Sequence, residues 1–202
     1  MSIDFLLLLP FLIMLIIFGL IIWFLVRMRR NEKIVIDENG NAVRSGLGGW
    51  LILVGFGLVI TPFRILGEIT QVYVPMFDNG RYEIITTPGT ALYHPFWSAF
   101  IWGEIVFNTF LGIASIALIV IFFSKKKIFT KFYIGFISFS FLFILADAML
   151  LSILSDIMLI KVAMSKPDIF SIIKGLMTGL LFVVIWIPYM LFSKRVKVTF
   201  IN

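Results

Sequence analysis

The chain has 202 residues, of which 61% are hydrophobic and only 14% are charged, whereas a soluble domain has about 45–50% apolar and about 25% charged residues. This composition excludes a soluble fold. The net charge of +6 does not indicate a nucleic-acid partner, because the basic residues lie in short blocks beside apolar runs, as in proteins that face an anionic membrane leaflet. Because the chain has no cysteine, a disulfide, an iron–sulfur cluster and a thiol nucleophile are excluded as well.

Five apolar runs predict membrane-spanning helices, because about 20 residues at about 1.5 Å per residue cross the ~30 Å hydrocarbon core. The predicted fold is therefore an all-α bundle of five transmembrane helices. They are expected near Phe5–Val26, Trp50–Glu68, Trp97–Phe123, Phe132–Ile160 and Ile169–Phe192. The first run follows no basic residue and is longer than the apolar core of a usual signal peptide, so we expect a retained helix.

The chain divides into two expected parts. Residues 1–44 predict an N-terminal transmembrane helix and a cytoplasmic hairpin, and residues 45–202 predict a four-helix transmembrane domain with an external loop at about 69–96.

Both of these connections have the pattern of a short β-hairpin. In the cytoplasmic one, the turn pair Asn39-Gly40 follows a β-branched run, which favours a type I′ turn. In the external one, between Gln71 and Thr87, Asp78-Asn79-Gly80 separates two runs rich in β-branched and aromatic residues. Pro75 makes its strand short or an edge strand.

The orientation follows from the distribution of lysine and arginine. Twelve of these residues lie in one set of connections and three in the opposite set, and this alternates correctly across all five expected helices. The positive-inside rule then predicts a multi-pass protein with its N-terminus outside and its C-terminus in the cytoplasm.

Several polar residues fall inside the expected spans, where an ionisable group costs about 2.5–3.5 kcal/mol on insertion scales and is a candidate functional site. We predict one intramembrane polar layer in which two bases balance two acids and an amide bridges them. Its members are Arg64, Glu104, Asn108, Asp147 and Lys174. It could be a register-fixing network, a proton or ion path, or a ligand or partner site facing the periplasm.

The C-terminal tail is the second candidate site. Its basic residues Lys194, Arg195 and Lys197 follow the last apolar run directly, and this position predicts binding to anionic lipid headgroups.

No motif in the chain indicates catalysis, a metal or a cofactor. The glycine-rich segment Gly46–Trp50 lacks the spacing of a phosphate-binding loop and is interpreted as a tight turn. The only histidine, His94, has no second ligand at metal-binding spacing.

Four stretches carry a family resemblance: Gly48-Gly-Trp-Leu51, Glu104 with Asn108, Ala146-Asp147, and the ending from Trp186 to Phe200. Together they resemble the YdgK-like family of uncharacterised bacterial inner-membrane proteins over roughly residues 45–200. The resemblance implies a four-helix membrane domain with the first helix and hairpin as an N-terminal addition. It also implies a location in a bacterial inner (cytoplasmic) membrane, and it implies no activity.

We therefore expect a non-enzymatic membrane protein, namely a sensor, accessory subunit or assembly factor that acts through helix or periplasmic-loop contacts. The alternative is a small oligomeric transporter or channel, coupled to protons or ions, that uses Glu104 and Asp147. An intramembrane enzyme would need an acid pair facing a cavity. The expected partners are the lipid bilayer and either further copies of the chain or another membrane protein.

Overall fold

The computed structural model describes residues 32–37, 39–90, 92–158 and 169–201, with the backbone alone at 151–158, 169 and 171. The first expected span, Phe5–Val26, lies outside the described residues. So do the last two residues of the fourth expected span.

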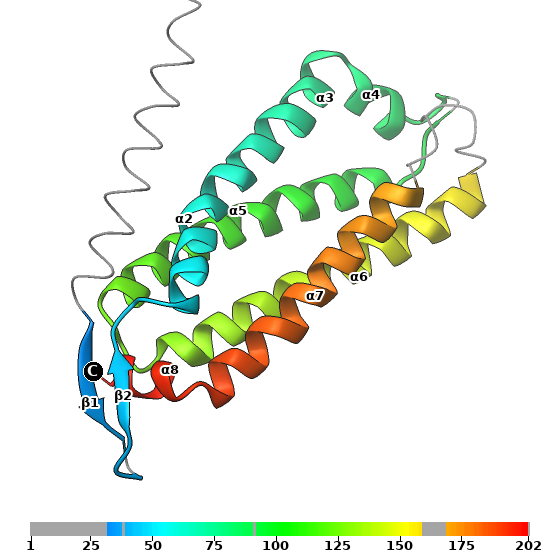
Figure 1. The fold of residues 1–202 in the computed structure, drawn as a ribbon. Helices are drawn as coiled ribbons and strands as arrows, with labels where there is room; N and C mark the ends of the chain where they lie inside the picture. Colours follow the sequence, from blue (N-terminus) through cyan, green and yellow to red (C-terminus); the bar gives the residue numbers. More distant parts are fainter. Residues whose placement is uncertain (1–31, 38, 91, 159–168, 202) are drawn as a thin grey trace, which may run out of the picture.

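Four long helices dominate the described structure (Figure 1). Each is long and apolar enough to cross a membrane, and the chain is a multi-pass membrane protein. The expected spans agree with these helices to within three residues at every described end. The helices are α2 (Trp50–Glu68), α5 (Phe96–Phe123), α6 (Phe129–Met158) and α7 (Ile169–Phe192).

The prediction of an external β-hairpin is wrong, because this segment is helical. After α2 the chain continues through the π-helical segment η1 (Ile69–Tyr73) into α3 (Val74–Asp78), and it then reverses into α4 (Arg81–Thr86). Pro75 lies in the first turn of α3, directly after the π-helical segment, where the hydrogen-bond pattern of the helix already departs from the regular α-helical one. Gly80 has a φ of 67°, so the expected turn exists but joins two helices.

The β-hairpin expected around Asn39-Gly40 is confirmed. Strand β1 (Lys33–Ile36) pairs antiparallel with β2 (Ala42–Ser45). The connection is longer than the two-residue turn expected, because Asp37 accepts hydrogen bonds from the backbone N–H groups of Asn39 and Asn41 at 3.0 and 2.8 Å. Gly40 supplies the left-handed position, with a φ of 78°.

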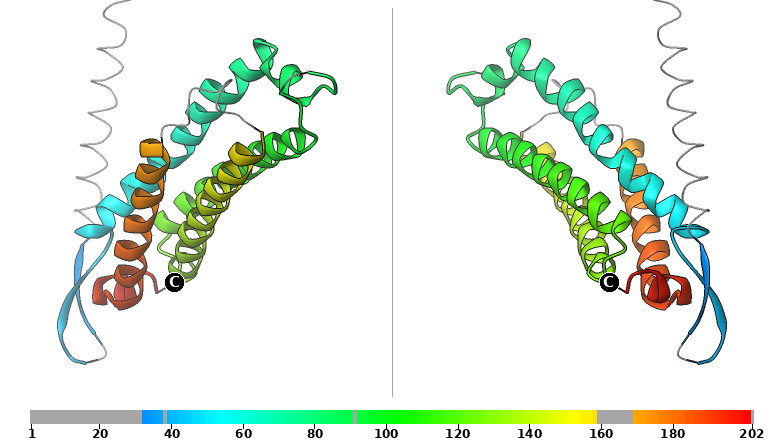
Figure 2. Two further views of the ribbon diagram at one scale, coloured as in Figure 1. Left: turned by 90° about the vertical axis from the view of Figure 1, so that its right-hand side faces the viewer. Right: turned by 90° about the vertical axis from the view of Figure 1, so that its left-hand side faces the viewer.

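The long helices converge toward the end of the bundle that carries the β-hairpin and the short helix α8 (Lys194–Thr199), called the hairpin end below (Figures 1 and 2). The opposite end, which carries α3 and α4, is called the far end. Helix α2 packs mainly on α5, and α6 packs mainly on α7.

The main apolar core lies at the hairpin end and includes residues from all four long helices and α8. Phe122 and Phe129 are fully buried there, and both rings contact that of Phe200. The core consists of Leu47, Leu51, Val54, Leu58, Leu118, Phe122, Phe129, Tyr133, Ile137, Trp186, Met190, Val196 and Phe200.

Candidate functional site

Polar side chains gather around Glu104 within the bundle. Glu104 and Asn108 share one face of α5 because four residues separate them. The Asn108 side-chain amide donates to the Glu104 backbone oxygen at 3.1 Å and lies 3.5 Å from Glu104 Oε2. The Tyr73 hydroxyl, which comes from η1, donates to the same Oε2 at 3.3 Å. Two elements therefore position the Glu104 carboxyl group.

A second acid faces Glu104 from the neighbouring helix. The Asp147 carboxyl group, on α6, lies within hydrogen-bonding reach of the Glu104 carboxyl group. Tyr73, Glu104, Asn108 and Asp147 form what is called the acid cluster below. Glu68, at the end of α2, lies close enough to both acids to interact with them electrostatically. Two facing carboxyl groups can share a proton or hold a cation between their oxygens.

Arg64 and Lys174 do not join this cluster. The Arg64 guanidinium lies 3.9 Å from the Glu68 carboxylate, one turn further along α2. Among the described residues, no carboxylate lies within ion-pairing distance of Lys174. The structure thus brings Glu104, Asn108 and Asp147 together and separates the two bases from them. Arg64 finds its acid at the i+4 position of its own helix, so it has no need to cross the bundle.

The two bases instead line one cavity between the long helices, called the basic groove below. Its volume is about 540 Å³, within the range of about 300–1,000 Å³ that small-molecule sites occupy. Its walls are mainly apolar, with Thr61, Ser140 and Thr178 as neutral polar members. The other lining residues are Arg64, Ile65, Leu111, Phe136, Ile137, Phe141, Ile144, Lys174, Gly175, Gly179, Phe182 and Val183.

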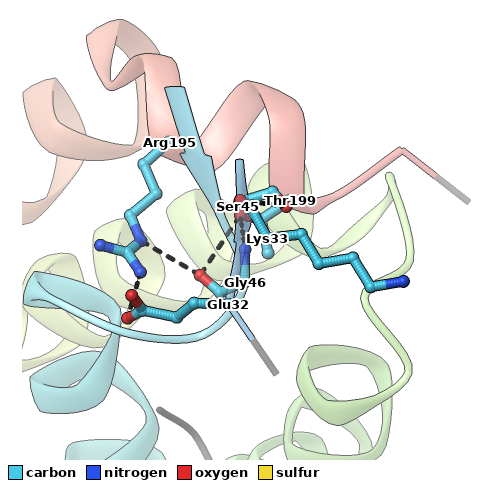
Figure 3. A network of polar contacts seen from close by, with 6 residues as sticks. All are labelled: Glu32, Lys33, Ser45, Gly46, Arg195 and Thr199. Carbon is cyan, nitrogen blue, oxygen red and sulfur yellow. Dashed lines mark hydrogen bonds and ion pairs between the residues drawn. The ribbon is translucent and has the colours of Figure 1, made fainter. Parts of the chain in front are cut away.

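A different polar network joins the β-hairpin, α8 and the connection between β2 and α2 at the hairpin end (Figure 3). The Arg195 guanidinium forms an ion pair with the Glu32 carboxylate and donates to the Gly46 carbonyl oxygen at 3.2 Å. The Thr199 hydroxyl accepts a hydrogen bond from Gly46 N–H at 2.9 Å. Glu32, Gly46, Gly48, Arg195 and Thr199 are called the junction below.

The glycines of this segment make room for the ion pair. A Cβ on Gly48 would overlap the Glu32 carboxylate and lie 2.6 Å from the Arg195 guanidinium. Gly49 has a φ of 60°, which favours glycine, and an added Cβ there would lie 2.9 Å from the same guanidinium. The Gly46–Trp50 turn therefore leaves the space that the Arg195 guanidinium occupies.

The three basic residues of the tail differ in their surroundings. Arg195 faces the protein, with only 19% of its side chain exposed. Lys194 is largely exposed and forms an ion pair with Asp37 across 3.6 Å. Lys197 lies exposed in the last turn of α8. The structure thus gives two of the expected headgroup ligands a partner within the protein.

Sequence reasoning missed Tyr73, Glu32 and Thr199. Tyr73 was assigned to a strand, although the apolar run of α2 continues through it and could have indicated a helix. Glu32 and Thr199 reach the junction across more than 150 positions of sequence, and no local pattern reports such a contact. Within the described residues, no group of three or more His, Asp or Glu side chains could hold a metal ion.

The comparisons with known proteins identify a family. The sequence model of a family described as "Protein of unknown function (DUF2569)" matches residues 44–201, and its start falls within β2. A search of curated proteins and a search of solved structures found no match.

Proposed function

We propose that this chain, which belongs to the DUF2569 family of proteins of unknown function, is a non-enzymatic sensor, accessory subunit or assembly factor that acts by binding a second molecule in the basic groove. The proposal rests on one observation: a cavity of about 540 Å³ lies between the four long helices and is lined by two basic side chains. Cavities of this size with few polar groups on apolar walls are typical binding sites.

The arrangement of the two ends supports a binding role. The apolar core at the hairpin end joins all four long helices, so the groove is built on a rigid base. Sites held by packed helices keep their geometry better than sites on loops. The second molecule, in this proposal, is a component of the bilayer, a second copy of the chain or another membrane protein.

The proposed location is a bacterial inner membrane, and the distribution of basic residues supports an orientation with the C-terminus in the cytoplasm. In this orientation the hairpin end is cytoplasmic and the far end, with α3 and α4, is periplasmic. Reporter fusions after residue 202 test this, since an enzyme active only in the periplasm must remain inactive there.

Photocrosslinking tests the groove. A photoreactive residue replacing Thr178, which lines the groove, should yield one discrete adduct in intact membranes. The matched control replaces Val184, an exposed residue of α7 that does not line the groove, and should yield a broad mixture of lipid adducts. The same mixture at both positions would show that the groove selects nothing.

The acid cluster supports a second candidate function, a small oligomeric transporter or channel coupled to protons or ions. Its observation is the Glu104–Asp147 pair, which can hold a proton or cation between its oxygens. Proteoliposomes containing the wild-type chain would then show a flux that the double change Glu104→Gln, Asp147→Asn abolishes. A flux that survives the double change would remove this candidate.

A further inference from the structure

Within the described part of the chain, neither basic side chain of the groove is fully neutralised. Lys174 has no ion-pair partner among the described residues. Arg64 has only Glu68, at 3.9 Å, with 64% of the Arg64 side chain and 46% of the Glu68 side chain exposed. A cation inside the bilayer is unfavourable unless it is paired or reaches water, so an anionic ligand here would relieve an unfavourable state of the empty groove.

The positions of these cations along the helices make the groove polar at one end. Arg64 lies 14 residues beyond Trp50, about 21 Å along α2. Lys174 lies 18 residues before Phe192, about 27 Å along α7. Both are therefore nearer the far end. Phe136, which lines the groove from α6, lies seven residues after the start of that helix and is therefore nearer the hairpin end.

The order of a basic end and an apolar end in the groove matches the structure of a lipid in the membrane leaflet at the far end. The headgroup of such a lipid lies at the membrane surface and its acyl chains point toward the bilayer centre. Arginine and lysine side chains lie with their apolar stems in the acyl region and extend their charged ends toward the surface. An anionic headgroup above and an acyl chain below would therefore meet the basic and apolar ends of the groove in the same order.

A second cavity shows that basic residues are a specific feature of the basic groove and not of every cavity between the helices. It lies between α5 and α6, has a volume of about 450 Å³, and has no charged residue among its lining residues, which include Phe110, Gly135 and Phe139. An apolar recess between these helices therefore needs no cation to form. Arg64 and Lys174 add a charge requirement to the first cavity that the second one lacks.

We propose that the basic groove binds one anionic glycerophospholipid, with its phosphate at Arg64 and Lys174 and one acyl chain along Phe141 and Phe182. The inference rests on the proposed binding function and names the ligand class for the same site. Glu68 does not block the phosphate, because its contact with Arg64 is long and largely exposed, so a phosphate oxygen can replace it. Arginine and phosphate form strong, charge-assisted hydrogen bonds.

The first test changes the charges. The full chain is reconstituted in nanodiscs that contain equal amounts of phosphatidylglycerol and phosphatidylethanolamine with identical acyl chains. It is then released from the nanodiscs, and the lipids that remain bound are identified by native mass spectrometry. The wild type should retain one phosphatidylglycerol. The change Arg64→Gln, Lys174→Gln should lower its occupancy relative to phosphatidylethanolamine by about tenfold or more.

The matched control is Lys125→Gln, Lys126→Gln, which removes two basic residues just after α5 at the hairpin end. It should leave the retained lipid in place. Equal losses in the two double variants would overturn the proposal, since the preference would then reflect total charge.

The second test fills the cavity without touching a charge. Gly175 lines the basic groove and Gly135 lines the uncharged cavity, and a Cβ on either would meet no atom within 4 Å. Gly175→Leu should therefore displace the phosphatidylglycerol, and Gly135→Leu should not. Retention in both variants would overturn the proposal, even if the charge variant itself were unstable.

Photocrosslinking at Thr178 distinguishes a wrong ligand class from a groove that binds nothing. A photoreactive residue at Thr178 that captures phosphatidylglycerol supports both the lipid ligand and the groove as a binding site. Capture of a peptide from residues 1–31, from a second copy or from another membrane protein would overturn the lipid ligand and keep the groove as a binding site. A mixture matching that at Val184 would overturn both.

Discussion

The two ends of the bundle use their polar residues in opposite ways. At the hairpin end, Arg195 has an acid and a carbonyl oxygen as partners, and the surrounding core is fully apolar. At the far end, Glu104 faces a second acid, and Lys174 lacks an acidic partner among the described residues. Charges that are balanced stabilise a fold, whereas charges that are left unbalanced in a membrane indicate a ligand or an ion. The first end therefore holds the bundle together, and the second is where we propose that a ligand binds.

The largest effect should come from the core of the hairpin end. Phe122→Ala should lower the free energy of unfolding by about 3 kcal/mol, the lower end of the range for a buried phenylalanine. We expect the lower end because exposing neighbouring apolar side chains to lipid costs less than exposing them to water. Phe63→Ala, at a side chain that is 72% exposed, should cost far less. Apparent melting temperatures in detergent measure both, and equal shifts would contradict a core confined to the hairpin end.

The junction should show the next largest effect. Arg195→Ala should cost about 2–3 kcal/mol, below the about 3–5 kcal/mol of a fully buried pair, because both side chains keep some exposure. Adding Glu32→Ala should restore part of this, with a coupling energy of about 1–2 kcal/mol. Lys194→Ala, at a lysine whose side chain is 60% exposed, should cost less than about 1 kcal/mol. Strictly additive losses in thermal unfolding would mean that Glu32 and Arg195 act independently.

The acid cluster should contribute less to stability than the junction. Tyr73→Phe removes the hydrogen bond to Glu104 and should cost about 0.5–1.5 kcal/mol. The control is Tyr93→Phe, at a hydroxyl that has no hydrogen bond to any described residue. A loss as large as that of Arg195→Ala would mean that the far end is also a structural centre.

The smallest effect should be a pH dependence confined to the β-hairpin. Hydrogen bonds from the Asn41 and Asn39 backbone N–H groups, aided by Lys194, hold the pKa of Asp37 below its ordinary value of 3.8. A lowered pKa in the folded state means that the charged carboxylate stabilises the hairpin above pH 3.8, and that this contribution is lost as the pH falls through the lowered value.

Hydrogen exchange of residues 33–45 measures this effect. Asp37→Ala should speed exchange at neutral pH and remove the acid dependence, whereas Asn41→Ala, which loses only a side-chain contact at 3.4 Å, should retain it. A wild-type exchange profile that does not change between neutral and acidic pH would show that the carboxylate is not what closes the loop.

Local sequence patterns predicted the helices and turns that neighbouring residues determine. The apolar runs marked α2, α5, α6 and α7 because each helix must satisfy its own backbone hydrogen bonds in lipid. Asn39-Gly40 marked the turn between β1 and β2 because glycine adopts a positive φ at little cost. The same reasoning misassigned Val74–Asp78, since a β-branched run beside a proline suits either a strand or a first helical turn. Sequence reasoning also grouped Glu104, Asn108 and Asp147 and added two bases that lie elsewhere.

By itself, the sequence determined that this is a multi-pass membrane protein, because the length and polarity of a spanning helix are set by the bilayer and are written within one segment. Only the tertiary structure decided which charges meet. Small differences in helix rotation and tilt turn a side chain from one neighbour to another, and packing between distant segments sets them. For that reason Arg195 meets Glu32, Asp147 meets Glu104, and Arg64 and Lys174 line a groove.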